Sequence, residues 1–411
     1  MFDKSKMSQK EEVLGQYPLP DGWRWVRLGE ICNVDSNQIL PNTSSARQLP
    51  YIGLEHVESG TGRIIDIVHD IAGNVIQSIT FRFDSRYVLY GKLRPYLNKV
   101  VTPDFEGRCT TELLPILPND SCDRYYLAWL LRRSDTVEVA MRYKTGTRMP
   151  RADMQEIFKI QIPLPPLSEQ RRISSKIQEL IQEVDRARAT CEKQLEATNA
   201  VPSAYLREVF ESEEAKKWER KRLGEVCDIV TGSTPRTDDP SNWNGDILWA
   251  TPNDLGKLPG LTIEDTERKI SKKGFESCSL KLLPIGSILL TTRAPIGHLA
   301  VNLDPMCTNQ GFKSLIPSAQ IHNWFLFFAL KYFVPVLQSL GRGQTFTEIS
   351  KNQVESFKIP LPVVDSQLRI ATELKEKMSI VEKAHLIIEK QFEAIRALSQ
   401  AILKKAFKGE L

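Results

Sequence analysis

Two stretches of sequence decide the fold: IPLPPLSEQRRI at residues 162–173 and IPLPVVDSQLRI at residues 359–370. They begin 197 positions apart, and a second pair, RLGEIC at residues 27–32 and RLGEVC at residues 222–227, is separated by 195 positions. Offsets that agree within two residues over so long a stretch are not expected by chance. The chain is therefore predicted to be a tandem duplication of units of roughly 200 residues.

Each repeat is predicted to contain a strand-rich region that ends where a long helix begins. The stretches RYVLYG at residues 86–91 and SILLTT at residues 287–292 are rich in β-branched and aromatic residues and are bounded by turn formers. The paired prolines of IPLP cannot continue a helix or a central strand. Ser168 and Asp365 then occupy positions suited to a helix N-cap, and Glu169 adds an acid that favours the helix dipole.

The two long helices carry a heptad-like stripe of apolar residues. Such a stripe favours packing against a partner helix, and two equivalent stripes in one chain can supply each other. Two amphipathic helices that lie separately on their own domains are the alternative. Pro202 is predicted to kink or cap the first helix near its end. The predicted seam comprises Ile173, Ile177, Leu180, Val184, Ala187 and Cys191 in the first helix, and Ile370, Leu374, Val381, Ala384, Ile388, Ile395, Leu398 and Ile402 in the second.

The predicted fold belongs to the α/β (α+β) class. It has two tandem repeated domains separated by two long helices, which form an antiparallel coiled coil with pseudo-two-fold symmetry. At about 1.5 Å per residue, each helix would be on the order of 65 Å long. We expect a lead segment at residues 1–17, globular domains at residues 18–167 and 212–364, a central helix at residues 168–211 and a C-terminal helix at residues 365–411.

Composition and charge limit the class of protein. The chain has 55 Lys and Arg against 51 Asp and Glu, a net charge of +4, so any nucleic-acid surface must be local. The N-terminus lacks the apolar core of a signal peptide, and the longest apolar run, residues 324–330, is far shorter than the about 20 residues of a membrane span. Seven scattered cysteines without a CxxC pair indicate reduced thiols. We therefore expect a cytoplasmic protein without a membrane partner.

Motifs for catalysis are missing from the sequence. It contains no phosphate-binding loop and no methyl-donor or nuclease motif, and its five histidines lack metal-ligand spacing. No nucleophile, base and oxyanion donor can be assembled from what remains. The sequence thus predicts no catalytic residue, no metal ligand and no cofactor in this chain.

Clusters of basic and polar residues recur at equivalent places in both repeats. Cations position phosphates, while Arg, Asn, Gln and Tyr on loops can also read base edges. A solvated basic face is the alternative for any single cluster. The equivalent stretches are 90–99 with 291–302, 109–112 with 307–310, and 142–151 with 341–351. The predicted DNA-binding residues are Lys92, Arg94, Tyr96, Asn98, Lys99, Thr110, Arg148, Arg151, Arg293, His298, Asn309, Gln310, Arg342, Gln344 and Thr345.

Taken in order, these stretches resemble the DNA-sequence specificity subunits of type I restriction–modification systems. The resemblance covers nearly the whole chain, from about residue 18 to the end. One departure is that PPLSEQ in the first repeat becomes PVVDSQ in the second, which leaves Gln170 and Gln367, and not Glu169, as the shared feature. The stretches that carry the resemblance are PLPDGWRWVRLGEIC (18–32), GKLRPYLNK (91–99), IPLPPLSEQRRI, TTRAPIG (291–297) and IPLPVVDSQLRI.

The resemblance implies two target-recognition domains, each of which reads one half of a bipartite, asymmetric sequence in double-stranded DNA. It also implies that the paired helices set the spacer between the half-sites and dock two methyltransferase subunits. S-adenosylmethionine, ATP and Mg²⁺ would belong to partner subunits, with restriction and translocase subunits as a further potential partner. The duplication itself supports this, since it lets one polypeptide meet DNA at two sites and two copies of one partner.

Two hypotheses of other classes remain. The chain could be a self-contained methyltransferase or nuclease, which the missing motifs argue against. It could instead be a structural coiled-coil adaptor without DNA contact, which salt-dependent DNA binding of the assembled complex would exclude.

Overall fold

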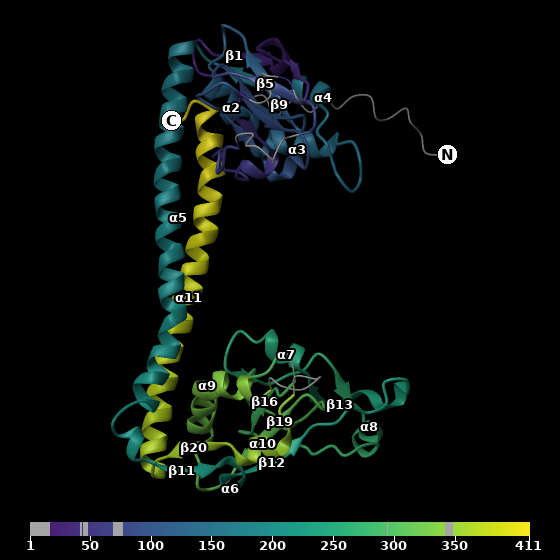
Figure 1. Ribbon diagram of the computed structural model, residues 1–411, viewed down its shortest axis with the longest axis vertical. Helices are drawn as coiled ribbons and strands as arrows, with labels where there is room; N and C mark the ends of the chain where they lie inside the picture. The colour runs from purple at the N-terminus through teal and green to yellow at the C-terminus, as the bar shows by residue number, and fades with distance from the viewer. Residues whose placement is uncertain (1–16, 42, 44–47, 69–76, 294, 342–347) are drawn as a thin grey trace. The chain divides into compact units, whose positions relative to one another are not determined.

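The protein is described by a computed structural model that covers residues 17–41, 43, 48–68, 77–293, 295–341 and 348–411. The chain forms two compact units: unit 1 comprises residues 1–190 and 391–411, and unit 2 comprises residues 191–390. Each unit contains the globular domain of one repeat, the first part of the helix that follows it and the last part of the other repeat's helix (Figure 1). The predicted duplication is therefore confirmed, with the addition that the two repeats exchange helix ends.

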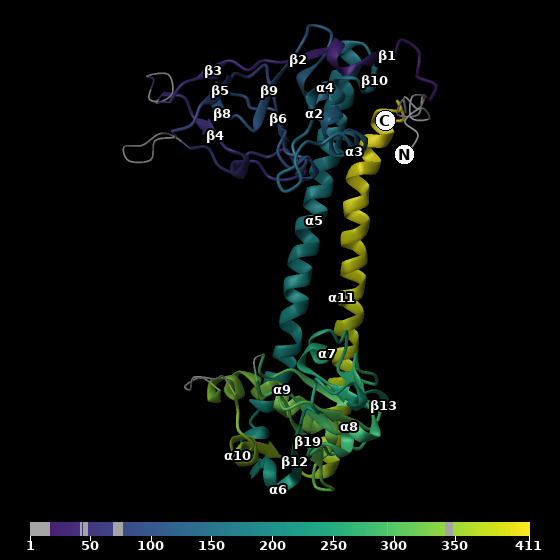
Figure 2. The same cartoon turned by 90° about the vertical axis from the view of Figure 1, so that its right-hand side faces the viewer.

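Unit 1 is built from a strand pair and two four-stranded sheets. Strands β1 (Arg24–Arg27) and β10 (Gln161–Leu164) form the antiparallel pair, which places the prolines of IPLP on an edge. The sheets have the orders β2-β9-β6-β7 and β3-β5-β8-β4, and the second lies on the side of the unit away from α5 (Figure 2). The other strands are β2 (Cys32–Val34), β3 (Gln38–Ile39), β4 (Tyr51–Ile52), β5 (Thr80–Phe83), β6 (Val88–Gly91), β7 (Val100–Val101), β8 (Gly107–Thr110) and β9 (Leu113–Pro118). The helices are α2 (Arg124–Arg132), α3 (Ser134–Arg142), α4 (Met154–Phe158) and α5 (Leu167–Phe210), with short 3-10 helices η2 (Leu28–Glu30), η3 (Leu54–His56) and η4 (Pro95–Leu97).

Unit 2 repeats this plan with different sheets. Strands β11 (Glu219–Arg222) and β20 (Lys358–Leu361) form the equivalent antiparallel pair. The sheets have the orders β12-β19-β16-β17-β14 and β15-β13-β18. The other strands are β12 (Cys227–Thr231), β13 (Trp243–Ala250), β14 (Thr262–Ile263), β15 (Lys269–Ile270), β16 (Ile288–Leu290), β17 (Leu299–Asn302), β18 (Met306–Thr308) and β19 (Lys313–Pro317). The helices are α6 (Leu223–Val226), α7 (Pro252–Gly256), α8 (Lys272–Glu276), α9 (Asn323–Leu340), α10 (Lys351–Ser356) and α11 (Val364–Ala406), with 3-10 helices η5 (Ala215–Lys217) and η6 (Pro240–Asn242).

The recurring RLGE stretches are explained by a close backbone approach. A side-chain carbon added to Gly29 would lie 3.1 Å from Cβ of Phe158, and one added to Gly224 would lie 3.2 Å from Cβ of Glu355. The residue before each glycine makes an equivalent hydrogen bond. The amide of Leu28 donates to the carbonyl oxygen of Ile160, just after α4, and the amide of Leu223 donates to that of Phe357, just after α10, both at 2.9 Å. In unit 1, η2 therefore packs against α4 too tightly for a residue larger than glycine, and in unit 2 the same holds for α6 against α10.

The strands expected at residues 86–91 and 287–292 are present as β6 and β16, and both long helices are present. Their ends differ from the expectation. Helix α5 continues for eight residues past Pro202, so this proline does not cap it. Helix α11 ends at Ala406 instead of at residue 411, and Gly409 follows with a φ of 75°. Ser168 and Asp365 occupy the second position of each helix and are not N-caps.

In the first turn of each long helix, a buried glutamine is hydrogen-bonded to the globular domain that precedes the helix. The Oε1 atom of Gln170 accepts from the amide of Asp123 at 2.8 Å, and its Nε2 donates to the carbonyl oxygens of Ser121 and Pro165 at 2.9 and 2.8 Å. Both glutamines are fully buried. The equivalent bonds of Gln367 join it to His322 (2.8 Å), Gln320 (3.1 Å) and Pro362 (2.8 Å). This glutamine brace explains why Gln, and not the neighbouring acid, recurs in both repeats.

Candidate nucleic-acid interface

The candidate interface of unit 1 is a loop that follows β6 and is joined to two other segments by backbone hydrogen bonds. The amide of Lys92 donates to the carbonyl oxygen of Glu112 (3.0 Å), and the carbonyl oxygen of Lys92 accepts from the amide of Ala152 (2.8 Å). The amide of Arg94 donates to the carbonyl oxygen of Pro150 (2.7 Å). We name this arrangement the three-segment junction. These backbone bonds hold the loop between the segment at Glu112 and the segment at Pro150 and Ala152.

Two residues of the loop adopt the left-handed backbone region: Arg94 with φ of 52° and Asn98 with φ of 48°. Such a conformation costs an L-residue roughly 1–2 kcal/mol, so other contacts must hold it. The Nδ2 atom of Asn98 donates to the carbonyl oxygen of Arg132 at 2.8 Å, and the Nζ atom of Lys99 donates to that of Leu54 at 2.7 Å. Asn98 and Lys99, both predicted to bind DNA, are therefore used to hold the loop.

Arg132, which was not among the predicted residues, is hydrogen-bonded to the end of the same loop. Its side chain is buried, and its Nε and Nη2 atoms donate to the carbonyl oxygen of Val100 at 3.1 and 2.5 Å. The guanidinium carbon lies 4.5 Å from the ring centre of Trp129. Burial lowers the pKa of Arg132 to about 10. Arg132 is the last residue of α2, and its local sequence gives no signal that separates a buried arginine from an exposed one.

The other predicted residues of unit 1 differ in what they present to solvent. Arg94, Tyr96 and Arg148 are exposed, while Lys92, Thr110 and Arg151 are half-buried. Arg148 lies in a turn closed by two backbone hydrogen bonds of 2.9 Å between Thr145 and Arg151. The guanidinium of Arg151 binds the carboxylate of Glu112, with Nη2 2.7 Å from Oε1. The basic run at residues 142–151 is thus partly neutralised by acids outside it.

Unit 2 contains the same three-segment junction. The amide of Thr292 donates to the carbonyl oxygen of Gly311 (2.8 Å), and the carbonyl oxygen of Thr292 accepts from the amide of Ile349 (2.9 Å). In unit 1 a bridge joins Leu93 to Arg151, and in unit 2 the equivalent bridge joins Arg293 to Glu348.

This register changes one correspondence suggested by the sequence. Arg293 takes the place of Leu93, and not that of Arg94. Leu93 directly follows Lys92, and Arg293 directly follows Thr292, the residue that makes the same backbone bonds in unit 2. The left-handed Asn98 is matched by Gly297, which has a φ of 97°. The loop of unit 2 is one residue shorter than that of unit 1.

The predicted residues of unit 2 lie around this junction. Arg293 and Gln310 are exposed, and His298 and Asn309 are half-buried. The Oδ1 atom of Asn309 accepts from the amide of Gly311 at 2.9 Å, and the amide side chain of Gln310 accepts from the hydroxyl of Thr234. His298 borders a small cavity of about 240 Å³ lined by Leu255, Gly256, Gly297, Leu299 and Lys331. Arg342, Gln344 and Thr345 lie outside the described residues.

Acids and a buried lysine at the junction were missed by the sequence reasoning. In unit 2, Oε2 of Glu348 accepts from Nε of Arg293 at 2.8 Å, and Oε1 accepts from Nζ of Lys313 at 3.3 Å. In unit 1 the acid is Glu112, and its partner is Arg151. A signal was present, since Arg151 and Glu348 are separated by 197 positions, the same offset as the IPLP stretches.

The long helices pack in opposite directions within each unit. In unit 1, Ile173 and Ile177 at the start of α5 share a buried cluster with Ile402 and Leu403 at the end of α11. In unit 2, Leu206 at the end of α5 shares a cluster with residues at the start of α11. The antiparallel pairing expected from the sequence is therefore present in both units.

Most of the predicted seam is buried. Ile173, Ile177, Val184, Cys191, Ile370, Leu374, Val381, Ile388 and Ile402 are buried, Leu180, Ala384 and Ile395 are half-buried, and Ala187 and Leu398 are exposed. The seam also contains aromatic ends that the heptad pattern did not include. The ring of Phe407 packs edge-on against Tyr126 at 5.1 Å, and Phe210 packs against Phe325 at 5.8 Å. The end of α11 thus packs on α2 in unit 1, and the end of α5 packs on α9 in unit 2.

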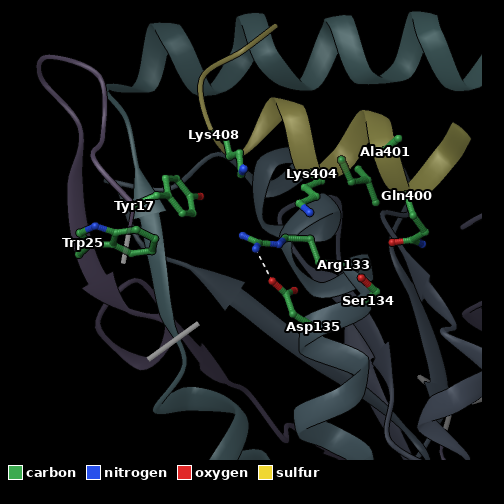
Figure 3. Close-up of a pocket in the computed structure, with 10 residues that line it drawn as sticks. Tyr17, Trp25, Arg133, Ser134, Asp135, Gln400, Ala401, Lys404 and Lys408 are labelled. Atoms are coloured by element: carbon green, nitrogen blue, oxygen red, sulfur yellow. Dashed lines mark hydrogen bonds and ion pairs between the residues drawn. The ribbon is translucent and has the colours of Figure 1, made fainter. Parts of the chain in front are cut away.

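Unit 1 has an open cavity of about 570 Å³ beside the end of α11 (Figure 3). Figure 3 shows Lys404 and Lys408 facing Arg133 and Asp135, which form an ion pair. The hydroxyl of Tyr17 donates to the carbonyl oxygen of Phe407 at 2.5 Å. The remaining lining residues are Trp25, Ser134, Gln400, Ala401 and Leu403. No residue predicted to bind DNA lines this cavity.

Unit 2 fills the equivalent place with an aromatic side chain. Tyr332 stands where unit 1 has Arg133, and its ring stacks on Phe210 at 5.2 Å. Its hydroxyl donates to the carboxylate of Glu211 at 3.0 Å. The two units therefore differ in side chains even where their helices meet in the same way.

The described residues show no arrangement typical of a metalloenzyme. Among them, no three His, Cys, Asp or Glu side chains gather as a metal site requires. Cys32, Cys227 and Cys307 form no disulfide, and burial raises the pKa of each to about 12. A thiol with so high a pKa is a poor nucleophile at neutral pH. No helix of the described chain has the length and apolar character to cross a membrane.

Known proteins share this architecture over nearly the whole chain. The type I restriction enzyme MjaVIII specificity subunit of Methanocaldococcus jannaschii is 25% identical, and the match covers 96% of this chain and 94% of that protein. The MjaIX specificity subunit of the same organism is 34% identical over a shorter match, which covers 47% of this chain and 44% of that protein.

Two solved structures agree with this. The crystal structure of the HsdS subunit from Thermoanaerobacter tengcongensis is 28% identical, with a TM-score of 0.66 and coverage of 97% of this chain and 99% of that chain. A structure solved in work on complex assembly and conformational transition of the type I R-M system is also 28% identical, with a TM-score of 0.83 and coverage of 96% and 100%. The family described as the type I restriction modification DNA specificity domain matches residues 20–197 and again residues 215–390. The chain therefore belongs to the type I restriction modification DNA specificity family and carries its domain twice.

Proposed function

We propose that this chain is the non-catalytic specificity subunit of a type I restriction–modification complex. Residues 18–167 and 212–364 would be its target-recognition domains, each reading one half of a bipartite, asymmetric DNA sequence. The observation that carries the proposal is the three-segment junction. The two backbone hydrogen bonds made by Lys92 in unit 1 recur at Thr292 in unit 2, at 2.8–3.0 Å, while the side chains presented there differ. A shared scaffold with different side chains is what two different half-sites require.

The long helices, predicted at residues 168–211 and 365–411, would set the spacer between the half-sites. The glutamine brace supports this role, because it fixes the start of each helix to its domain through three hydrogen bonds. If each helix is rigidly attached to the domain that binds a half-site, the length of the helices sets the number of base pairs between the half-sites.

The same helices would dock two methyltransferase subunits. Both units bury an equivalent seam and leave the outer faces of α5 and α11 exposed. A duplicated surface fits two copies of one partner. S-adenosylmethionine would then be bound by those subunits, and ATP and Mg²⁺ by restriction and translocase subunits where these are present. A soluble complex of this kind would act in the cytoplasm.

The proposal is tested by co-expressing the chain with methyltransferase subunits and mapping the modified bases of the host DNA. We expect one bipartite sequence with two dissimilar halves. Exchanging residues 18–167 for the recognition domain of another family member should replace one half and leave the other unchanged. A palindromic target, or a change in both halves, would contradict the proposal.

The alternative of a self-contained enzyme predicts a different result. If the purified chain alone transfers methyl groups to DNA, or cleaves it, with partner subunits shown to be absent, the chain is an enzyme and the proposed role is wrong.

A further inference from the structure

The ion pairs at the two junctions use their arginines differently. In unit 1 both Nε and Nη2 of Arg151 donate to the carboxylate of Glu112, at 3.1 and 2.7 Å. In unit 2 only Nε of Arg293 donates to Glu348, at 2.8 Å. Within the described chain, Nη1 and Nη2 of Arg293 have no hydrogen-bond acceptor, and the side chain is 48% exposed. Both Nη nitrogens of Arg293 are therefore left to donate elsewhere, whereas in Arg151 one hydrogen of Nη2 is already bound to Glu112.

Glu348 is itself held by a second cation. Its other carboxylate oxygen, Oε1, accepts from Nζ of Lys313 at 3.3 Å, and the side chain of Lys313 is only 5% exposed. Burial alone would raise the pKa of Glu348, but the hydrogen bonds from Arg293 and Lys313 lower it below its usual value. The carboxylate is thus ionised at neutral pH and is fixed on both sides.

The counterpart positions in unit 1 show that this is a coordinated difference. Where unit 2 has Lys313, unit 1 has Leu114, which is 7% exposed and apolar. Where unit 2 has Arg293 and Glu348, the bridge in unit 1 joins Leu93 to Arg151. A buried lysine is costly unless it is paired, so Lys313 and the acid at position 348 belong together.

Two parallel donors on an exposed guanidinium match one edge of one base. In the major groove guanine presents O6 and N7 as neighbouring acceptors, and arginine is its most frequent bidentate partner. A phosphate contact would benefit less from this arrangement, because the carboxylate behind the guanidinium repels the phosphate charge. A carboxylate that orients an arginine from behind instead serves a contact in which direction matters.

We propose that Arg293 reads a guanine in the half-site recognised by unit 2, and that Glu348, anchored by Lys313, is the positioning residue that aims it. The inference rests on the proposed function of the chain. It assigns no such reading role to Arg151, whose guanidinium is bound to Glu112 by two nitrogens.

The test uses the full chain assembled with its methyltransferase subunits and DNA duplexes that carry the mapped target. Each guanine of the half-site assigned to unit 2 is replaced in turn by 7-deazaguanine, which keeps base pairing but removes the N7 acceptor. We expect kcat/KM for methylation to fall at one guanine by roughly 10- to 150-fold, the contribution of one hydrogen bond to a charged group, because O6 is still present. With Arg293→Ala the same replacement should have no effect.

Glu348→Gln tests the positioning role. It should reduce discrimination at that guanine on the order of 3- to 10-fold, as expected for residues in one ion-pair network. Glu348→Asp should restore part of it. Lys313→Leu introduces the residue of unit 1 and should give a smaller loss in the same direction. Arg151→Ala is the matched control and should leave discrimination in this half-site unchanged.

The outcomes separate the inference from the proposed function. If the wild-type complex modifies no specific sequence, the proposed function fails. If it modifies a bipartite sequence but is insensitive to 7-deazaguanine throughout this half-site, or if Arg293→Ala keeps the sensitivity, only the inference is overturned. If Glu348→Gln lowers thermal stability without changing discrimination, Glu348 has a structural role and is not a positioning residue.

Discussion

Units 1 and 2 have the same backbone connections but differ in the charges placed on them. The glutamine brace has the same three hydrogen bonds in each unit. At the three-segment junction the two backbone bonds of Lys92 recur at Thr292, yet the next residue is Leu93 in one unit and Arg293 in the other. The duplicated chain has thus kept what joins a domain to its helix and changed what faces outward. The comparison separates residues that build the scaffold from residues that give each unit its own chemistry.

The largest effect is expected from charges placed in the helix seam, where the two units are most alike. Ile177 and Leu374 are fully buried, so Ile177→Asp or Leu374→Asp would place an unpaired carboxylate in an apolar cluster, at a cost of at least about 3 kcal/mol. Co-elution with the methyltransferase on a sizing column should be lost. Leu398→Asp is the control, because Leu398 is 48% exposed. Equal elution of all three variants would show that the seam does not support assembly.

The next prediction breaks the equivalence of the helices in length. A heptad inserted after Val184 and another after Val381 keeps the apolar stripe in register and adds about 10 Å to each helix. At about 3.4 Å per base pair, the mapped target should gain one to three base pairs between unchanged half-sites. A heptad in only one helix should misalign the seam and abolish assembly. An active complex with the original spacer would refute the role of the helices in setting the distance.

A smaller effect is expected when one unit loses its glutamine brace. Gln170→Ala leaves buried backbone groups without partners and should destabilise unit 1 by about 1–3 kcal/mol, and Gln367→Ala should do the same in unit 2. Hydrogen exchange should increase near Ser121 for the first variant and near Gln320 for the second. Glu169→Ala serves as the control, since its partly exposed ion pair with Arg172 should contribute less than about 1 kcal/mol. Increased exchange in both units from either variant would indicate that the braces are coupled.

An effect of similar free energy, confined to DNA binding, is expected for one exposed side chain of the loop in unit 1. Arg94→Ala should weaken binding to the half-site of unit 1 by roughly 5- to 150-fold if Arg94 reads a base. A phosphate contact would instead weaken all sequences alike and lower the salt slope by about one. Competition between duplexes altered in one half-site, repeated at two salt concentrations, decides between these roles. A loss at the half-site of unit 2 would contradict independent reading.

The sequence predicted the features that depend on local pattern. The duplication, the strands β6 and β16 and the two long helices all follow from repeats and periodicity. It could not predict the junction, because an ion pair such as Arg293 with Glu348 joins residues 55 positions apart. The stretches 90–99 and 291–302 were predicted to be equivalent, but the hydrogen-bond register is needed to show that Arg293 stands at the place of Leu93. Pro202 and Ser168 were assigned helix-end positions that the continuous α5 does not give them.

Helix exchange between the repeats has a consequence for how the chain is made. Unit 2 is one continuous stretch, residues 191–390, whereas unit 1 also needs residues 391–411. The ring of Phe407, which packs on Tyr126, is synthesised only after the whole of unit 2. Domains tend to fold as units during translation, starting from the N-terminus. Here the domain that is synthesised first is completed after unit 2, so its apolar surface around Tyr126 stays uncovered until residues 391–411 have been translated. A chain terminated before residue 391 would carry a complete unit 2 beside an unfinished unit 1, and would be exposed to aggregation and proteolysis.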